Sequence, residues 1–422
     1  MKIFIGTVNI ASQLGDWKFG FEKNSCKVSI GSFGNHSLIV SGDYDYLISP
    51  SFHYRLPGLS SYTLNKKYNK LLNSIYGDYR KWLLKKILRE YDVFFFIWRG
   101  ILDDFSDFDM IKQAGKKLLV QFVGDDVRWE PAARQEFIKR GMLPIEYDSY
   151  DYSYNSLYRK LNFLRYAEKY ADLIYSRPNQ AQIALRPYGV NPYLVIPEEF
   201  EENNYQREIS RIIHYPSSSA FKGTKYIYQS IEYLKESRLQ FAFESTGQGV
   251  TYGSNLNKIP YTEMKKNYAT CDILIGQLLC PGGGKQEREL LASGKIVMSN
   301  INRYYESHIP KECPIIDVNP DNLAEKLKEI ILDYDKRSAL AKLGRPYVEQ
   351  FHDPVKITAR ILEELTTGEY KCPTYQPTFF REEFIPESPE HLEVYNKWTE
   401  FVKNEDWYRQ TVPSGERAGL IF

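Results

Sequence analysis

The sequence predicts a protein of two α/β domains, each built on a doubly wound parallel sheet. Short runs rich in Val and Ile alternate with amphipathic stretches, which is the pattern of parallel sheets covered by helices on both faces. The alternation restarts near residue 210, after the polar and acidic segment 197–204. The length of 422 residues exceeds one ordinary core and suits two domains of roughly 150–200 residues each.

The expected elements fall into two series. The first series of candidate strands covers 3–5, 27–30, 46–48, 93–97, 117–123, 173–175 and 193–196. The second series covers 211–215, 239–243, 273–275, 296–298 and 314–317. Helical periodicity is found at 79–91, 157–170, 226–234, 261–269 and 322–333. We therefore expect an N-terminal domain at 1–200, a C-terminal domain at 205–372, and a tail at 373–422 that contains a helix near 389–403.

Composition excludes several classes of protein. The net charge of +1 gives no electrostatic basis for nucleic-acid binding. The N-terminus lacks the apolar region of a signal peptide, and the longest apolar run, at 93–98, is far shorter than the roughly 20 residues of a membrane-spanning helix. The five cysteines form no C-x-x-C pair, so neither a disulfide framework nor a zinc site is expected. These features predict a cytoplasmic protein.

A first candidate site follows the strand at 211–215. A small polar loop at 216–220 leads into Lys222 and Gly223, and Ser218 lies in the same loop. Ligands of α/β sheets bind at the carboxyl ends of parallel strands, where Lys222 could neutralise a diphosphate beside a helix N-terminus. The alternative is a solvated lysine in an ordinary strand–helix loop, and this segment alone favours neither interpretation.

A second candidate site follows the strand at 273–275. Three glycines, Gly282, Gly283 and Gly284, precede Lys285 and a helical segment that contains Glu289. Glycines allow backbone N–H groups to approach an anion closely. An ionised carboxylate such as Glu289 accepts hydrogen bonds from vicinal ribose hydroxyls. The alternative is a glycine loop that serves turn geometry only.

Both segments, in this order and spacing, resemble the C-terminal domain of GT-B glycosyltransferases, specifically the retaining enzymes known as family four. The matching pieces are Lys222-Gly223, Gly284 and the run Glu289-Leu290-Leu291-Ala292-Ser293-Gly294, within an element order that covers about residues 1–370. The resemblance implies a GT-B fold, in which two Rossmann-like doubly wound domains face each other across a cleft. It also implies that the C-terminal domain binds a nucleotide-sugar donor and the N-terminal domain binds the acceptor.

The N-terminal half adds two segments to this resemblance. The run Phe122-Val123-Gly124-Asp125-Asp126-Val127-Arg128 is similar to the loop after a central strand in many of these enzymes, and Gly6 belongs to the opening strand and loop. The resemblance implies that Asp125, Asp126 and Arg128 face the cleft as catalytic candidates, and that Gly6 lies on the donor side. One aspartate would orient or deprotonate the acceptor hydroxyl. The alternative for the aspartates is capping of a strand–helix loop.

Two positions depart from the family pattern. Pro281 stands where the family has the first Glu of its signature, a residue associated with the donor sugar. The arginine that often precedes the lysine has no counterpart among Ser217, Ser218 and Ser219. Lys285 could supply the missing positive charge.

The resemblance implies transfer of a sugar from a UDP- or GDP-linked donor to a hydroxyl of a sugar or lipid-linked glycan acceptor. It further implies retention of anomeric configuration, a role in bacterial polysaccharide or glycoconjugate synthesis, and no metal or other cofactor. Two alternatives stay open. Pro281 motivates a GT-B-like binding or partner protein with impaired catalysis, and a GT-B nucleotide-sugar epimerase is the other, although the six scattered histidines give it little support.

Other signals are weaker. Asp43-Tyr44-Asp45 and Asp107-Phe108-Asp109 have the Asp-x-Asp form of metal-dependent glycosyltransferases, but neither is beside a recognisable phosphate loop, so no metal role is expected. The glycine segment 247–253 misses the dinucleotide fingerprint, and His214 is expected to be a core residue. The basic amphipathic segment 79–89 is expected to pack on the sheet, with contact to an anionic membrane surface as the alternative.

Overall fold

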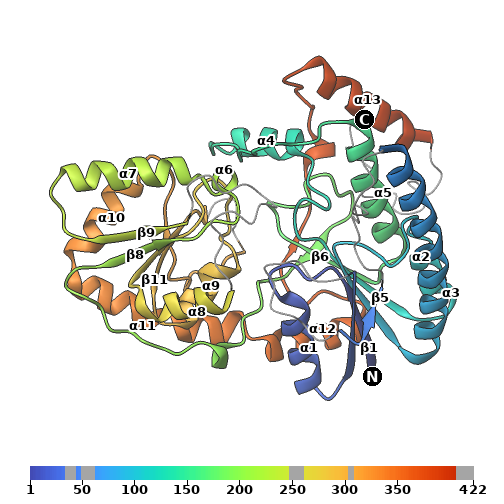
Figure 1. Cartoon of the computed structure of the whole chain (residues 1–422), viewed down its shortest axis with the longest axis horizontal. Helices are drawn as coiled ribbons and strands as arrows, with labels where there is room; N and C mark the ends of the chain where they lie inside the picture. Colours follow the sequence, from blue (N-terminus) through green and yellow to red (C-terminus); the bar gives the residue numbers. More distant parts are fainter. Residues whose placement is uncertain (34–43, 49–61, 247–260, 303–307, 405–422) are drawn as a thin grey trace.

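The computed structural model describes residues 1–33, 44–48, 62–246, 261–302 and 308–404. In this part of the chain two α/β domains lie side by side, each with helices on both faces of a largely parallel sheet (Figure 1). This arrangement confirms the predicted fold class. The first residue of the Asp-x-Asp motif at 43–45 and the glycine segment 247–253 lie outside the described residues.

The N-terminal sheet has the strand order β13-β7-β6-β5-β4-β1-β2-β3, in which only β13 is antiparallel among the described strands. Its strands are β1 (Lys2–Thr7), β2 (Lys27–Ser32), β3 (Tyr46–Leu47), β4 (Val93–Ile97), β5 (Lys117–Gln121), β6 (Leu173–Ser176), β7 (Tyr188–Val190) and β13 (Thr374–Tyr375). The helices that precede residue 200 are α1 (Gln13–Lys23), α2 (Tyr62–Glu90), α3 (Ser106–Gln113), α4 (Glu130–Lys139) and α5 (Tyr154–Tyr170). The chain order reverses between β1 and β4, which is the switch point of a doubly wound sheet.

Side chains of the central strands alternate between two hydrophobic layers, as a sheet buried on both faces requires. Phe94 and Phe96 of β4 pack in one layer, while Val93, Phe95 and Ile97 pack in the other. All five side chains are at most 2% exposed. The apolar run that was too short to span a membrane is therefore the centre of a core, and no described helix is long and apolar enough to cross a bilayer.

The C-terminal sheet has the order β12-β11-β10-β8-β9 and is parallel throughout its described strands. Its strands are β8 (Arg211–His214), β9 (Ala242–Ser245), β10 (Ile273–Ile275), β11 (Ile296–Ser299) and β12 (Ile316–Asp317). The helical elements around it are η1 (Pro197–Glu199), α6 (Ser219–Lys222), α7 (Thr224–Glu236), α8 (Tyr261–Thr270), α9 (Lys285–Ala292), α10 (Leu323–Leu332) and α11 (Tyr334–Phe351). Its switch point lies between β8 and β10, which pair directly.

The chain returns to the N-terminal domain earlier than the expected boundary at 373. Helix α12 (Pro354–Thr367) packs against α1, and its N-cap Asp353 accepts a side-chain hydrogen bond from Val355 N. Ile357, Ile361 and Leu365 join the N-terminal core because the apolar stripe of α12 faces it. The elements η2 (Phe379–Arg381) and α13 (Pro389–Asn404) follow, and α13 contacts α5.

One expected strand is wrong. Residues 193–196 form no strand, and the strand that pairs with β6 is β7, five residues earlier. Leu194 and Val195 are buried, but they pack in the cores of different domains. Their hydrophobic pattern therefore reflects the passage of the chain between the domains.

Candidate functional site

Two loops meet at the switch point of the C-terminal sheet. Lys222 is the last residue of α6, the short helix after β8, and the loop after β10 contains the three glycines. The Lys222 amine donates to Gln277 Oε1 at 2.5 Å and lies 3.5 Å from the position that a Cβ on Gly284 would take. Leu278 N donates to the Lys222 carbonyl at 3.0 Å, which ties the loops together. The structure thus brings together Lys222 and the glycine segment, which are about sixty residues apart in sequence.

The glycine loop needs glycine at specific positions. Gly282 and Gly283 have φ values of 90° and 64°, which side chains rarely adopt. A Cβ on Gly283 would also collide with the Arg288 guanidinium. Arg288 Nη1 donates to the Gly284 carbonyl at 3.2 Å, so this carbonyl of the loop already has a hydrogen-bond partner within the protein. Gly284 is the N-cap of α9, whose first backbone N–H groups have no partner within the helix.

Glu287 is a residue of this site that the sequence analysis missed. Its side chain is 1% exposed, accepts from Ser299 Oγ at 3.2 Å, and lies beside Gly284 and Lys222. Burial raises the pKa of Glu287, but Lys222, Arg288 and the adjacent backbone N–H groups together outweigh burial, so the net pKa is lowered. A Glu three residues after a helix N-cap is a known capping signal, and it could have indicated this residue.

Lys285 and Glu289 occupy a different side of α9 from Glu287. Lys285 Nζ donates to Asp16 Oδ2 at 2.5 Å and to the Ala11 carbonyl at 2.9 Å, both in the N-terminal domain. Glu289 accepts from Tyr261 OH at 2.7 Å and from Tyr268 OH at 3.3 Å. The Glu289 carboxylate, expected to bind ribose, is therefore engaged by two tyrosines of α8, and Lys285 holds the two domains together.

The other expected donor residues have structural contacts. Ser218 caps α6 by accepting from Phe221 N at 3.3 Å, and donates to Asp148 Oδ2 of the N-terminal domain at 3.1 Å. Gly223 ends α6 with φ 73°. Gly6 lies within β1, where a Cβ would be 3.0 Å from the Gly31 carbonyl. Close strand packing accounts for Gly6 without any ligand.

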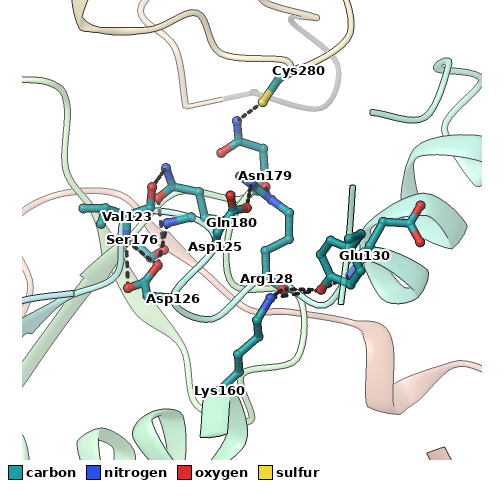
Figure 2. Close-up of polar contacts among 12 residues, drawn as sticks. Val123, Asp125, Asp126, Arg128, Glu130, Lys160, Ser176, Asn179, Gln180 and Cys280 are labelled. Carbon is teal, nitrogen blue, oxygen red and sulfur yellow. Dashed lines mark hydrogen bonds and ion pairs between the residues drawn. The ribbon is translucent and has the colours of Figure 1, made fainter. Parts of the chain in front are cut away.

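The loop after β5 contains the three catalytic candidates (Figure 2). Asp126 is 8% exposed and accepts from Val123 N at 3.2 Å and from Gly124 N at 2.7 Å, so it caps the loop. Burial raises the pKa of Asp126 to about 7. Asp125, with a side chain 34% exposed, pairs with Arg128 Nη1 at 2.9 Å. Of the two aspartates, Asp125 is the one that solvent or a ligand can reach.

Arg128 is held from several directions. Its Nε donates to the Asn179 carbonyl at 3.1 Å, and its guanidinium lies 5.5 Å from the centre of the Phe221 ring in the C-terminal domain. The Arg128 carbonyl accepts from Lys160 Nζ at 2.6 Å and from Tyr150 OH at 3.0 Å, as Figure 2 shows for the lysine. Burial lowers the pKa of Lys160 to about 8. Arg128 thus lies at the boundary between the domains.

The residues set aside earlier have structural roles. His214 is buried between the Ile275 carbonyl and Thr224 Oγ1, at 2.8 and 2.9 Å from its ring nitrogens, and burial lowers its pKa to about 4. Asp107, in the first turn of α3, accepts from Ile101 N at 2.6 Å. Among the described residues, no three His, Cys, Asp or Glu side chains gather as a metal-ligand set.

Comparison with known proteins shows the fold. No family model and no curated protein sequence matches the chain. Among solved structures, Anabaena HepE in complex with UDP-glucose is similar at 12% identity and a TM-score of 0.51, over 87% of this chain and 99% of that chain. The N-terminal domain of Candida albicans trehalose-6-phosphate phosphatase is similar at 10% identity and a TM-score of 0.53, over 87% and 97%. A glycosyltransferase from Rickettsia africae is similar at 11% identity and a TM-score of 0.50, over 87% and 99%. The chain has the GT-B fold of two Rossmann-like domains.

Proposed function

We propose that the chain is a glycosyltransferase that moves a sugar from a nucleoside diphosphate sugar to an acceptor hydroxyl. The observation that carries the proposal is the Lys222 amine beside Gly284, at the N-terminus of α9 and at the switch point of its sheet. An amine and the backbone N–H groups of a helix N-terminus at such a point suit a diphosphate. The likeness in fold to HepE, whose structure contains UDP-glucose, supports this choice of ligand.

The proposed chemistry follows from where charge develops. When the bond between sugar and diphosphate breaks, negative charge grows on the phosphate oxygens, and Lys222 with the amides of the glycine loop would stabilise it. Asp125 is proposed to orient or deprotonate the acceptor hydroxyl, because its carboxylate is the more exposed of the two aspartates. Asp126 is left out of this role because backbone N–H groups already hold it.

The finer features of the reaction are proposals of the same kind. We propose a UDP- or GDP-linked donor, retention of configuration, and transfer without a metal or other cofactor, since Lys222 and the amides would supply the positive charge. The proposed acceptor is a sugar or a lipid-linked glycan in bacterial polysaccharide or glycoconjugate synthesis, and the proposed location is the cytoplasm. Acceptor specificity would then depend on the N-terminal domain.

A peripheral membrane contact is proposed through α2. Ile75, Tyr79 and Trp82 are 54%, 38% and 57% exposed and follow a helical spacing, with the exposed Lys81 and Lys85 nearby. An apolar stripe flanked by lysines suits an anionic membrane surface. Co-sedimentation with lipid vesicles measures this contact.

A second candidate function is a GT-B-like binding protein without transferase activity. It is favoured by the engagement of the Glu289 carboxylate with two tyrosines and of Lys285 with Asp16. The epimerase alternative has weaker support, because His214 is buried with both ring nitrogens bonded. Release or transfer of sugar from a nucleotide sugar would separate the transferase from the binding protein.

The first test is calorimetric titration with UDP, GDP and ADP. Wild-type protein should bind at least one of them, and Lys222→Ala should weaken that affinity by about 1.5–3 kcal/mol, or about 10- to 150-fold, because a charged hydrogen bond to phosphate is lost. Lys235→Ala is the matched control, since Lys235 is an exposed lysine paired with Glu232 at the end of α7. Equal affinities of Lys222→Ala and wild type would remove Lys222 from the site.

A further inference from the structure

Asn179 contacts the glycine loop from the opposite domain. It follows β6 in the N-terminal domain and is 4% exposed. Its side-chain Nδ2 donates to the Pro281 carbonyl at 2.6 Å and lies 3.2 Å from Cys280 Sγ, the contact drawn in Figure 2. Pro281 directly precedes the three glycines, so this hydrogen bond joins the N-terminal domain to the proposed donor site.

The side-chain oxygen of Asn179 has no such contact. The orientation of the amide is fixed, because a carbonyl only accepts hydrogen bonds and Pro281 must therefore face the NH2 group. The oxygen, Oδ1, then points elsewhere, and it is a buried acceptor without a hydrogen-bond partner among the described residues. Buried polar atoms in native proteins are rarely left unpaired, and each one calls for a physical explanation.

The neighbours of Asn179 indicate which ligand could supply the missing donor. On one side its backbone carbonyl binds Arg128, which pairs with Asp125, the proposed base. On the other side its amide binds Pro281 at the start of the proposed phosphate loop. A group between the base and the diphosphate is the sugar that is to be transferred. Sugar hydroxyls are donors, and an acceptor-only oxygen can recognise them.

We propose that Asn179 Oδ1 accepts a hydrogen bond from one hydroxyl of the sugar carried by the donor nucleotide. This inference rests on the proposed function and assigns to the N-terminal domain a part in selecting the donor sugar. Asn179 lies at the boundary of the domains, so separation of the domains would expose its oxygen to an incoming ligand.

The experiment uses the nucleotide that the full chain binds, its sugar conjugate, and conjugates in which one sugar hydroxyl at a time is replaced by fluorine. Fluorine cannot donate a hydrogen bond. At one position, the replacement should weaken wild-type binding about 3- to 10-fold, as expected for one neutral hydrogen bond. The same replacement should change the affinity of Asn179→Ala and Asn179→Leu by less than about twofold, because these variants lack the acceptor. Asn179→Leu nearly preserves the side-chain volume and serves if the alanine variant fails to fold.

The neighbouring residue provides the control. Gln180 is in the same loop, but its amide is already paired, with Nε2 donating to the Val123 carbonyl at 3.0 Å and Oε1 accepting from Ser176 Oγ at 3.5 Å. Gln180→Ala should keep the wild-type response to fluorine. An identical fluorine response in wild type and both Asn179 variants overturns this inference alone, and so does a wild type that no fluorine position weakens. A wild type that binds no nucleoside diphosphate overturns the proposed function as well.

Discussion

At the scale of single residues, the proposed phosphate site contains its own negative charge. Glu287 is buried beside Lys222, and its lowered pKa keeps it ionised. A diphosphate that binds here must therefore share Lys222 with Glu287 and displace the contact to Gln277. Glu287 also lies against Gly284, so a diphosphate would compete with this carboxylate for the backbone N–H groups at the start of α9.

The ion pair of Asp16 with Lys285 yields a prediction about pH. Burial raises the pKa of Asp16 to about 7 from an ordinary value of 3.8, despite the opposing effect of Lys285. Because the folded state holds the proton more tightly, the contribution of Asp16 to stability is greatest below pH 3.8 and is lost as pH rises to about 7. An asparagine at position 16 stays neutral at every pH. As pH rises through this window, the free energy of unfolding of Asp16→Asn should therefore increase relative to that of wild type, by at most about 1.4 kcal/mol per pH unit.

Urea unfolding at a series of pH values between these limits measures the difference. Asp335→Asn, at an exposed position in the first turn of α11, is the control and should follow the wild-type profile. A free-energy difference between Asp16→Asn and wild type that stays constant with pH would contradict the prediction.

At the scale of elements, the contact of α1 with α12 joins the first helix of the chain to a helix more than 300 residues later. Gly20 makes this contact possible, because a Cβ there would collide with the Pro354 carbonyl and would be 2.8 Å from Thr358 Cγ2. Asn24 Nδ2 adds hydrogen bonds to the Val355 carbonyl at 2.8 Å and to Thr358 Oγ1 at 2.9 Å. The return of the chain therefore depends on close approach of two helix backbones.

Two glycines of α1 provide a matched test of this contact. Gly20→Ala should lower the free energy of unfolding by about 1–3 kcal/mol, because the added methyl group forces the helices apart. A Cβ added at Gly15 would have no atom within 4 Å. Gly15→Ala should therefore raise the free energy of unfolding by up to about 1 kcal/mol through helix propensity alone. Urea denaturation of the two variants gives both values, and changes of the same sign would refute the packing argument.

At the scale of the whole molecule, the two domains contact each other over a loop that begins after α4. Glu146 accepts from Tyr226 OH at 3.0 Å and pairs with Lys225 at 2.8 Å, and Met142 and Ile145 pack against Cys280. The hydrogen bond from Asn179 to Pro281 and the ion pair of Lys285 with Asp16 lie at the same boundary between the domains. A substrate that enters between the domains must therefore break several polar contacts.

The exposed apolar stripe of Ile75, Tyr79 and Trp82 on α2 predicts which side of the molecule would bind a membrane surface. Helix α2 lies at the outer edge of the N-terminal domain, away from the C-terminal domain (Figure 1). The protein should co-sediment with vesicles that contain phosphatidylglycerol more than with pure phosphatidylcholine. Trp82→Glu should weaken this binding about tenfold, because a large apolar side chain no longer enters the interface.

Leu332→Glu is the matched control for membrane binding. Leu332 is 64% exposed on α10 of the C-terminal domain, and its substitution should leave vesicle binding unchanged. Equal effects of the two substitutions, or no binding to anionic vesicles, would remove the membrane proposal.

Much of the architecture could be predicted because it depends on local patterns. The strands at 93–97 and 273–275 have the expected bounds, since each is a continuous apolar run buried on both faces. The segment 193–196 has a similar composition but passes between two cores, which periodicity does not distinguish from a strand. Residues 354–367 fall inside the predicted C-terminal domain, but they form α12 and pack on the N-terminal core, because an apolar stripe does not specify the surface that it covers.

The sequence by itself determined the two α/β domains, the position of Lys222 after β8 and of the glycine loop after β10, and the core role of His214. Each of these follows from residue types within a short segment. Only the tertiary structure decided that Glu287 lies beside Lys222, that two tyrosines engage Glu289, and that Asn179 reaches Pro281. The physical reason is that a side chain's partner and charge state depend on burial and on residues far away in the sequence, which no local pattern contains.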